Sequence, residues 1–281
     1  LEGHRRLAST IREHGSLAVI QLHHAGMRSP ADLIGEVPVC PSAHEESGAR
    51  ALSHGEVQQL RDDFIAAAER AQRAGYDGVE IHGAHGYILC QFLSPEFNQR
   101  EDEYGGSLEN RARIFHEIVR GIRDRCGDGF LLGVRLSPER FGMDLDACKT
   151  VAQGLIDTGK IDFLDLSLWD CFKRPIDEAN QDKTLLEHVL DLDRNGVRLT
   201  VAGKIFSGGD VQSILDAGVD FVTIGRAAIL HHDYPDKVLA DPSFEPAALP
   251  VTPEYLRNEG LGSAFVAYMR RWKGFVSEDV G

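Results

Sequence analysis

The sequence predicts an α/β fold built on a parallel sheet, and within that class a TIM or (β/α)8 barrel. Six short runs rich in Val, Ile and Leu are separated by longer amphipathic stretches, which is typical of strands that alternate with helices. The runs show little alternation of polar and apolar residues, as expected for parallel strands buried on both faces. No G-x-G-x-x-G follows any of them, so an open dinucleotide-binding sheet has no support. The expected strands are 17–22, 78–82, 131–135, 163–166, 199–202 and 221–224.

The connecting stretches carry the periodicity of helices. Within residues 55–74, Val57, Leu60 and Phe64 recur at close to a 3.6-residue spacing. Ser107 is a good N-cap for the next helix. Further helices are expected at 146–158, 184–192 and 209–217, each followed by Gly or Asp, as a helix-to-strand turn prefers.

The number of repeats bounds the domain organisation. About six βα units are visible, whereas a (β/α)8 barrel has eight. The six are expected to be strands 3–8, with the two missing units before Leu1, which is not a Met. We expect residues 1–240 to form the barrel and residues 241–281 to form a tail or helix that packs on the barrel or on a neighbouring subunit.

Composition excludes several classes of function. The chain has 281 residues, 30 Lys and Arg against 44 Asp and Glu, and a net charge of −14. Such an acidic chain is a poor nucleic-acid binder, because that needs basic groups to displace counterions. No apolar run approaches the length of about 18 residues that a membrane span requires. The five cysteines include no C-x-x-C pair, so we expect no disulfide framework, no thiolate metal site and a reducing, cytoplasmic compartment.

Candidate site residues lie where an α/β barrel places its chemistry, at the carboxyl ends of the strands. His82, His85 and Tyr87 form the sharpest group. Imidazole N–H groups can polarise a carbonyl, and a phenol can deliver a proton. The other strand ends carry Gln21, Arg135, Gly203 with Lys204, and Gly225 with Arg226.

Each of these features also has a plainer interpretation. A lone histidine is usually solvated or satisfied in the core, although two beside Tyr87 argue against that. A histidine metal site would want a carboxylate at ligand spacing, and none is there, so no metal is expected. Arg135 either pairs with a carboxylate or neutralises a bound anion. Gly203 and Gly225 are either ordinary turn glycines or, with Arg226, a phosphate site of late barrel strands.

Five segments together carry a family resemblance. They read QLHHAGMRS at 21–29, HGAHGYILCQFLSPEFNQREDEYGGSLENRAR at 82–113, GVRLSP at 133–138, VAGKI at 201–205 and VTIGRAAI at 222–229. These segments resemble the old yellow enzyme family of FMN-dependent NAD(P)H oxidoreductases. The resemblance extends from Leu1 to about Pro235, and the segment 82–113 is long and specific.

The resemblance implies which residues bind the cofactor. Gln21 would hydrogen-bond the pyrimidine edge of FMN. Arg135 would lie near flavin N1 and O2 and stabilise the anionic reduced flavin. The FMN phosphate would be held by late-strand residues, and the expected set is Gly203, Lys204, Gly225 and Arg226.

The resemblance also implies which residues meet the substrate. His82 and His85 would bind the carbonyl oxygen, and Tyr87 would be the proton donor. Histidine at both positions is similar to the bacterial branch of the family, whereas the yeast branch has asparagine at the second. Trp169 follows a strand end and either lines the substrate pocket or packs in the core.

The function implied is an ene-reductase that takes hydride from NAD(P)H and reduces the activated C=C bond of an α,β-unsaturated carbonyl or nitro compound. A small enone-type substrate and a homo-oligomer are expected, with no nucleic-acid or membrane partner. Two alternatives stay open: a flavin-free lyase or aldolase acting on a phosphorylated substrate, and an inactive truncated barrel. No segment matches the family's first two βα units, and Met27 stands where Arg is usual, with Arg28 next.

Overall fold

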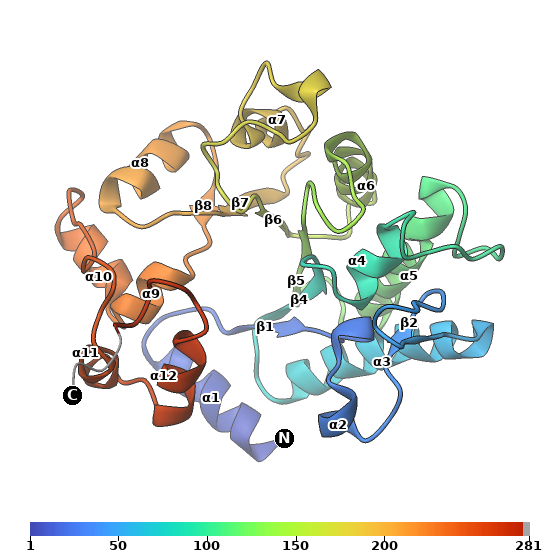
Figure 1. Cartoon of the computed structure of the whole chain (residues 1–281), viewed down its shortest axis with the longest axis horizontal. Coiled ribbons are helices and arrows are strands. Elements are labelled where there is room, and N and C mark those ends of the chain that lie inside the picture. Colours follow the sequence, from blue (N-terminus) through green and yellow to red (C-terminus); the bar gives the residue numbers. More distant parts are fainter. Residues whose placement is uncertain (278–281) are drawn as a thin grey trace. The chain divides into compact units, whose positions relative to one another are not determined.

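The structure is a computed structural model that describes residues 1–277. The chain separates into two compact units (Figure 1). Unit 1 comprises residues 1–168 and 172–201, and unit 2 comprises residues 169–171 and those from 202 onward. The domain boundary expected at residue 240 stays a prediction, and residues 278–281 of the expected tail lie outside the described residues.

Unit 1 is built on a sheet with strand order β1, β4, β5, β6, β7. Parallel pairing joins β1 to β4, β4 to β5 and β5 to β6. All the strands expected in this part of the chain are present, with ends within about two residues of the prediction. They are β1 Val19–Leu22, β4 Gly78–Gly83, β5 Leu131–Leu136, β6 Phe163–Ser167 and β7 Arg198–Ala202.

The helices predicted between these strands are also confirmed. Ser53 begins α3 with a capping box that includes Glu56, and Ser107 caps α5 by accepting a hydrogen bond from the Asn110 N–H at 3.2 Å. The four helices are α3 His54–Arg73, α5 Leu108–Cys126, α6 Leu145–Asp157 and α7 Leu185–Leu190.

Unit 1 also contains elements that periodicity did not predict. Most are a single turn or a two-residue strand, too short to show a period. The long one, α1, exposes nearly all of its residues and has only Ala8 buried. They are α1 Glu2–Glu13, η1 Gly26–Arg28, α2 Ala31–Ile34, β2 Val39–Cys40, β3 Arg50–Ala51, α4 Ile88–Leu93 and η2 Glu178–Asn180.

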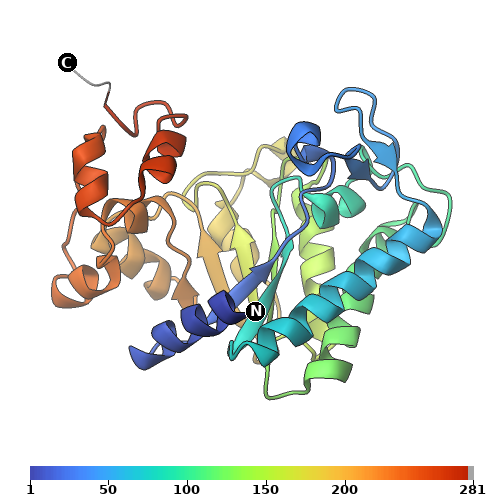
Figure 2. The ribbon, with the colours of Figure 1, turned by 90° about the horizontal axis from the view of Figure 1, so that it is seen from below.

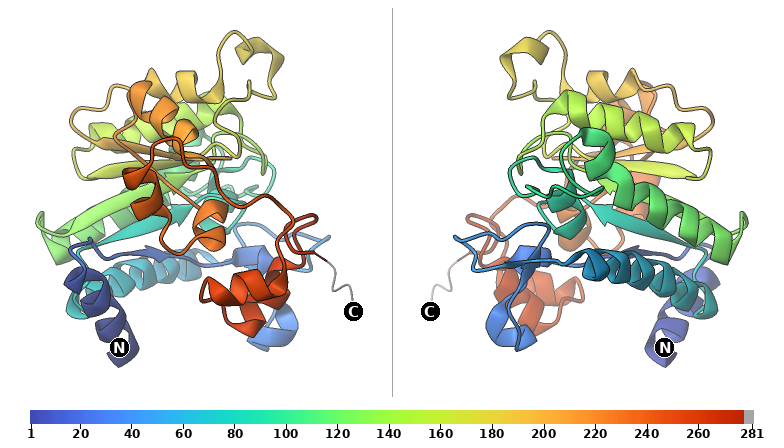
Figure 3. Two further views of the ribbon diagram at one scale, coloured as in Figure 1. Left: turned by 90° about the vertical axis from the view of Figure 1, so that its left-hand side faces the viewer. Right: turned by 90° about the vertical axis from the view of Figure 1, so that its right-hand side faces the viewer.

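One face of the sheet is apolar and packs under α3 and α5. These two helices lie against each other and along the strands (Figure 2 and Figure 3). Ile81 and Val134, on neighbouring strands, are fully buried. Phe115 of α5 packs so closely on Gly83 that a Cβ there would lie 2.3 Å from its ring. Burial of this face holds the strands in register. The opposite face of the sheet is then free to carry polar side chains.

The segment after α4 is held by its own polar side chains. The buried Asn98 amide donates to the carbonyls of Phe92 at 2.7 Å and Tyr104 at 2.8 Å. Arg100 pairs with Asp102 and donates to the Pro41 carbonyl at 2.9 Å. These bonds give the loop between α4 and α5 one conformation without a hydrophobic core of its own.

Unit 2 contains the sixth predicted strand, which is shorter than expected, and five helices among its described residues. Helices α11 and α12 pack around a small core formed by Leu256, Val266 and Met269 (Figure 2). No helix in the described part of the chain is long and apolar enough to cross a bilayer. The elements are α8 Gly208–Asp216, β8 Phe221–Val222, α9 Arg226–Leu230, α10 Tyr234–Ala240, α11 Pro253–Asn258 and α12 Ser263–Met269.

A buried arginine ties the end of α5 to the amino-terminal edge of the sheet. Arg123 is 8% exposed and forms an ion pair with Asp162. Its guanidinium also donates to the carbonyls of Lys160 at 2.6 Å, Phe130 at 2.6 Å and Gly127 at 3.2 Å. The charge is therefore buried with a carboxylate and three carbonyls as partners, so that removing it would leave these groups without their donor.

Replacing Arg123 with Met should lower the free energy of unfolding by about 3 kcal/mol, because three carbonyls and a carboxylate lose a charged donor. Urea unfolding measures this change. Arg125→Met is the matched control, because the Arg125 side chain is 64% exposed. Its ion pair with Glu69, at 3.4 Å, is therefore a surface contact. The control should change stability by no more than about 0.5 kcal/mol. Equal losses in both variants would contradict the structural role of Arg123.

Candidate functional site

The second face of the sheet in unit 1 is polar. The strand register pairs Gln21 with Glu80, His82 with Arg135, and Arg135 with Asp165. Residues two apart on a strand point to the same face, so these pairs share one face. This polar face comprises Gln21, Glu80, His82, Arg135, Asp165 and Ser167.

The structure brings His82, His85 and Tyr87 together at the end of β4. The ring centroids of His82 and His85 are 5.0 Å apart, and those of His82 and Tyr87 are 5.4 Å apart. His23, from the end of β1, joins the group edge-on to Tyr87 at 4.2 Å. His23 directly follows the expected strand 17–22 but was not among the predicted site residues. We call these four rings the aromatic cluster.

The turn that carries the cluster has an unusual backbone. His85 has φ of 62°, in the left-handed region that few residues other than glycine adopt, although Asn, Asp and His do so more often than most. Its N–H donates to Ser137 Oγ at 3.1 Å, and its carbonyl accepts from Arg28 Nη1 at 2.6 Å. The Arg28 guanidinium also lies 5.0 Å from the centre of the Tyr87 ring. Hydrogen bonds at both ends hold this strained residue in place.

His82 and His85 are both uncharged at neutral pH. Burial, reinforced by His85, Arg135 and His23, lowers the pKa of His82 to about 3. Burial and the positive charges of Arg135 and Arg28 lower the pKa of His85 to about 4. Each ring therefore offers one N–H donor and one lone pair. The Nδ1 atom of His82 is buried and has no hydrogen-bond partner within residues 1–277.

Arg135 is neutralised within the protein, as one of the two interpretations of the sequence required. Its Nε lies 3.4 Å from Asp165 Oδ2 and donates to Ser167 Oγ at 2.8 Å. Gln21 donates its side-chain N–H to Glu80. Both contacts of Arg135 use Nε, so its two terminal amino groups form no hydrogen bond to any other described residue.

Unit 2 contains the residues expected at the phosphate. The Gly203 carbonyl accepts from the Cys171 N–H at 3.1 Å, and a Cβ on Gly203 would lie 2.8 Å from the backbone N of Asp170. The approach is therefore closed to any larger residue. Lys204 forms an ion pair with Asp170 at 2.8 Å. Trp169 is 50% exposed, which argues against packing in the core.

The second glycine of the expected phosphate site lies before α9. A Cβ added to Gly225 would meet nothing within 4 Å, so the backbone here faces open space. The guanidinium of Arg226 lies 4.8 Å from the centre of the Phe206 ring, which orients it by a cation–π contact. The expected site residues thus form two sets, one within each unit.

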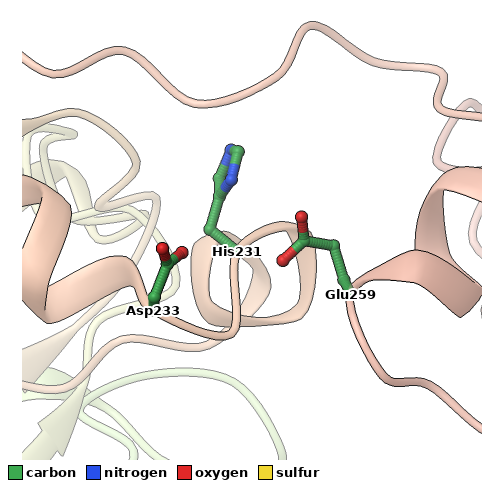
Figure 4. A group of neighbouring side chains, drawn as sticks. All are labelled: His231, Asp233 and Glu259. Carbon is green, nitrogen blue, oxygen red and sulfur yellow. The ribbon is translucent and has the colours of Figure 1, made fainter.

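A further histidine in unit 2 lies beside two carboxylates. His231, Asp233 and Glu259 have potential ligand atoms within 4.8 Å of one another (Figure 4). Both carboxylates have other partners, since Asp233 pairs with Lys237 at 3.0 Å and Glu259 with His232 at 2.8 Å.

The hydrogen bonds of His231 argue against a metal ion. Its Nε2 accepts from the Ala247 N–H at 2.9 Å, so the ring proton belongs on Nδ1. Nδ1 lies 3.3 Å from the Tyr255 hydroxyl, which itself donates to the Leu230 carbonyl at 3.0 Å. Neither nitrogen keeps a free lone pair, and we assign the cluster to the packing of unit 2.

Comparison with known proteins identifies the class of protein. Residues 1–241 match the sequence profile described as the NADH:flavin oxidoreductase / NADH oxidase family. This is a family of FMN-dependent flavin oxidoreductases of NADH or NADPH, which argues against the flavin-free alternative. The chain belongs to the NADH:flavin oxidoreductase / NADH oxidase family, and its resemblance to old yellow enzymes is confirmed.

The individual relatives agree with this assignment. The chain is 34% identical over 249 residues to the probable NADH-dependent flavin oxidoreductase YqiG of Bacillus subtilis, covering 85% of this chain and 67% of that protein. It is 34% identical over 264 residues to the NADH:fumarate oxidoreductase of Klebsiella pneumoniae, covering 87% of this chain but 28% of that protein. The chain spans only part of the length of these relatives, so their names do not establish what this chain acts on.

Solved structures confirm the predicted fold class, a parallel (β/α)8 barrel. The old yellow enzyme homologue from Zymomonas mobilis matches with a TM-score of 0.74 and 28% identity, covering 91% of this chain and 74% of that one. Morphinone reductase in complex with tetrahydroNAD also matches with a TM-score of 0.74 and 28% identity, covering 99% of this chain and 77% of that one.

The neutral histidines give the protein a pH dependence with a definite sign. Because the folded-state pKa values of His82 (about 3) and His85 (about 4) lie below the unfolded value, the unfolded state binds more protons between about pH 4 and pH 6.5. The free energy of unfolding should therefore fall as the pH falls through this range. In His82→Asn the fall should be smaller, measured by urea unfolding between about pH 5 and pH 7. The exposed His14, replaced by Gln, is the control; an unchanged slope in His82→Asn would refute the assignment.

Proposed function

We propose that the chain reduces the activated C=C bond of an α,β-unsaturated carbonyl or nitro compound at the expense of NAD(P)H. The observation that carries the proposal is the gathering of two uncharged imidazoles and one phenol at the end of β4. Neutral N–H donors suit an oxygen atom on which negative charge develops, and a phenol suits the delivery of one proton.

The residues of unit 1 fit the pyrimidine end of FMN. The Gln21 amide and the Arg135 guanidinium lie on the polar face, and the terminal amino groups of Arg135 form no hydrogen bond to other described residues. The buried Nδ1 of His82, likewise without a partner in residues 1–277, is the kind of atom that a bound group satisfies. When bound, FMN supplies the hydride-transfer chemistry.

The residues of unit 2 fit a phosphate. Gly203 and Gly225 leave backbone without a side chain, and the Arg226 guanidinium can form two parallel bonds to phosphate oxygens. Lys204, already paired with Asp170, adds positive charge beside them. We assign the FMN phosphate to this set.

Substrate activation falls to His82 and His85. Their N–H groups would donate to the carbonyl or nitro oxygen, and these bonds strengthen as charge builds up in the transition state. Each contributes roughly 2–4 kcal/mol in sites of this kind. Because both rings are neutral, they polarise the oxygen without protonating it. Tyr87, 5.4 Å from His82 between ring centroids, then gives its proton to the α-carbon.

The surroundings of Lys204 do not favour the Schiff-base mechanism that a flavin-free aldolase would use. A Schiff-base lysine is activated by desolvation or by another cation. The Lys204 side chain is 55% exposed and is paired with a carboxylate.

The function is tested by an anaerobic titration of the FMN-loaded protein with NADH and NADPH, followed by turnover of a cyclic enone. Bleaching of the flavin absorbance by either nucleotide, and its recovery when the enone is added, would support the proposal. A protein that does not retain FMN, or whose flavin neither nucleotide reduces, would refute it and favour an inactive truncated barrel.

Replacing Tyr87 with Phe should slow enone reduction by about 10²–10⁴-fold, because the general acid is lost. Reduction of the flavin by NAD(P)H should be nearly unchanged. Stopped-flow absorbance follows the two half-reactions separately. Tyr76→Phe is the matched control, since Tyr76 is buried and its hydroxyl lies 3.1 Å from His4 Nδ1. Equal slowing of both half-reactions would remove Tyr87 from the proton-donor role.

We further propose that the chain forms a homo-oligomer through the exposed aromatic residues of α12 and the turn after it. Phe265 and Tyr268 stack at 5.7 Å between ring centroids, Arg271 lies over Tyr268, and Trp272 is 43% exposed. Aromatic residues and Arg are enriched at protein interfaces. Sedimentation should show an oligomer that Tyr268→Glu converts to monomer; a monomeric parent protein would refute this.

A further inference from the structure

In the site of unit 1, Ser167 lies between Arg135 and His85. It is the last residue of β6, its side chain is on the polar face, and it is 8% exposed. Its Oγ is 2.8 Å from Arg135 Nε and 3.0 Å from His85 Nε2. The hydroxyl therefore connects the arginine assigned to the flavin with a histidine assigned to the substrate.

The donors and acceptors of this contact assign its protons. Arg135 Nε can only donate, so Ser167 Oγ is the acceptor there. The hydroxyl has one proton of its own, and within residues 1–277 the remaining partner is His85 Nε2. A buried hydroxyl that does not donate loses a hydrogen bond. The arrangement that satisfies both groups has Ser167 O–H donating to a bare Nε2.

This hydrogen bond determines the tautomer of His85. If Nε2 accepts, the single proton of the neutral ring is on Nδ1. The hydrogen bond from Arg135 also polarises the Ser167 hydroxyl and makes it a stronger donor, because bonds in a chain reinforce one another. The left-handed backbone of His85, held by Ser137 and Arg28, limits how the ring can reorient.

We propose that Ser167 is a positioning residue that fixes His85 as the Nδ1–H tautomer and so presents that N–H to the substrate oxygen. The tautomer follows from this chain's hydrogen bonds alone; the second step rests on the proposed function. Ser167 touches neither reacting atom in this scheme, and it acts through His85.

The tautomer is measured directly by ¹⁵N NMR of the protein labelled at histidine, as purified and after FMN is added. His85→Gln identifies the His85 signals by their loss. The parent protein should show a protonated Nδ1 and a bare Nε2 at His85, and Ser167→Ala should show a mixture of tautomers. A protonated Nε2 in the parent protein would overturn the proposal. So would an unchanged pattern in Ser167→Ala.

Two further variants separate a tautomer effect from general loosening of the site. Ser167→Thr keeps a hydroxyl at the same position and should keep the parent pattern. Ser137→Ala removes a hydroxyl that, within residues 1–277, accepts a hydrogen bond from the His85 backbone and forms none with the ring, so the ring should also keep its tautomer. A mixture of tautomers in Ser137→Ala as large as that in Ser167→Ala would reject the specific role of Ser167.

Kinetics test the second step. Ser167→Ala should lower kcat/KM for enone reduction by roughly tenfold, the effect of losing a well-oriented hydrogen bond. Flavin reduction by NAD(P)H should be slowed less than enone reduction, and Ser167→Thr should restore most of the loss in both. If the parent protein reduces no enone, the proposed function fails, and the NMR result still decides the tautomer. Parent-level enone kinetics in Ser167→Ala would overturn the link to the substrate.

Discussion

The site depends on the lateral register of three parallel strands. Pairing of β4, β5 and β6 places His82, Arg135 and Asp165 in one row across the sheet. A shift of one residue in any strand would turn its members of the row toward the helices. The apolar face under α3 and α5 prevents such a shift, because Ile81 and Val134 would then leave the core. Hydrophobic packing on one face thus sets the electrostatics of the other.

Most of the segment 82–113, which carries much of the family resemblance, has a structural role. Only three of its residues, His82, His85 and Tyr87, belong to the aromatic cluster. Farther along, Asn98 donates to carbonyls on both sides of it in the chain, and Arg100 donates to the distant Pro41 carbonyl. At Gly105 a Cβ would lie 2.0 Å from the Arg100 carbonyl. The specificity of this motif comes from the demands of a loop that has no hydrophobic core.

Period was enough to predict the six strands of the larger sheet and the long helices between them, because these bury apolar faces with a regular repeat. It missed α1, which buries only Ala8. The strand-end rule located His82, His85 and Tyr87, and the structure brings these three together. It could not supply contacts between residues far apart in the chain. Ser167 meets His85 across 82 positions and Arg28 reaches the same residue across 57, so neither was included in the site. The assigned roles of the site residues remain predictions.

The left-handed turn at His85 bears on how such a site can change during evolution. Asparagine adopts this backbone conformation more readily than histidine, and its side-chain amide also carries an N–H donor. The resemblance to old yellow enzymes implies asparagine at this place in the yeast branch. What an exchange between the two residues has to keep is the direction in which the turn points a donor. Either side chain can meet that geometric requirement, and histidine does so at some expense in backbone energy.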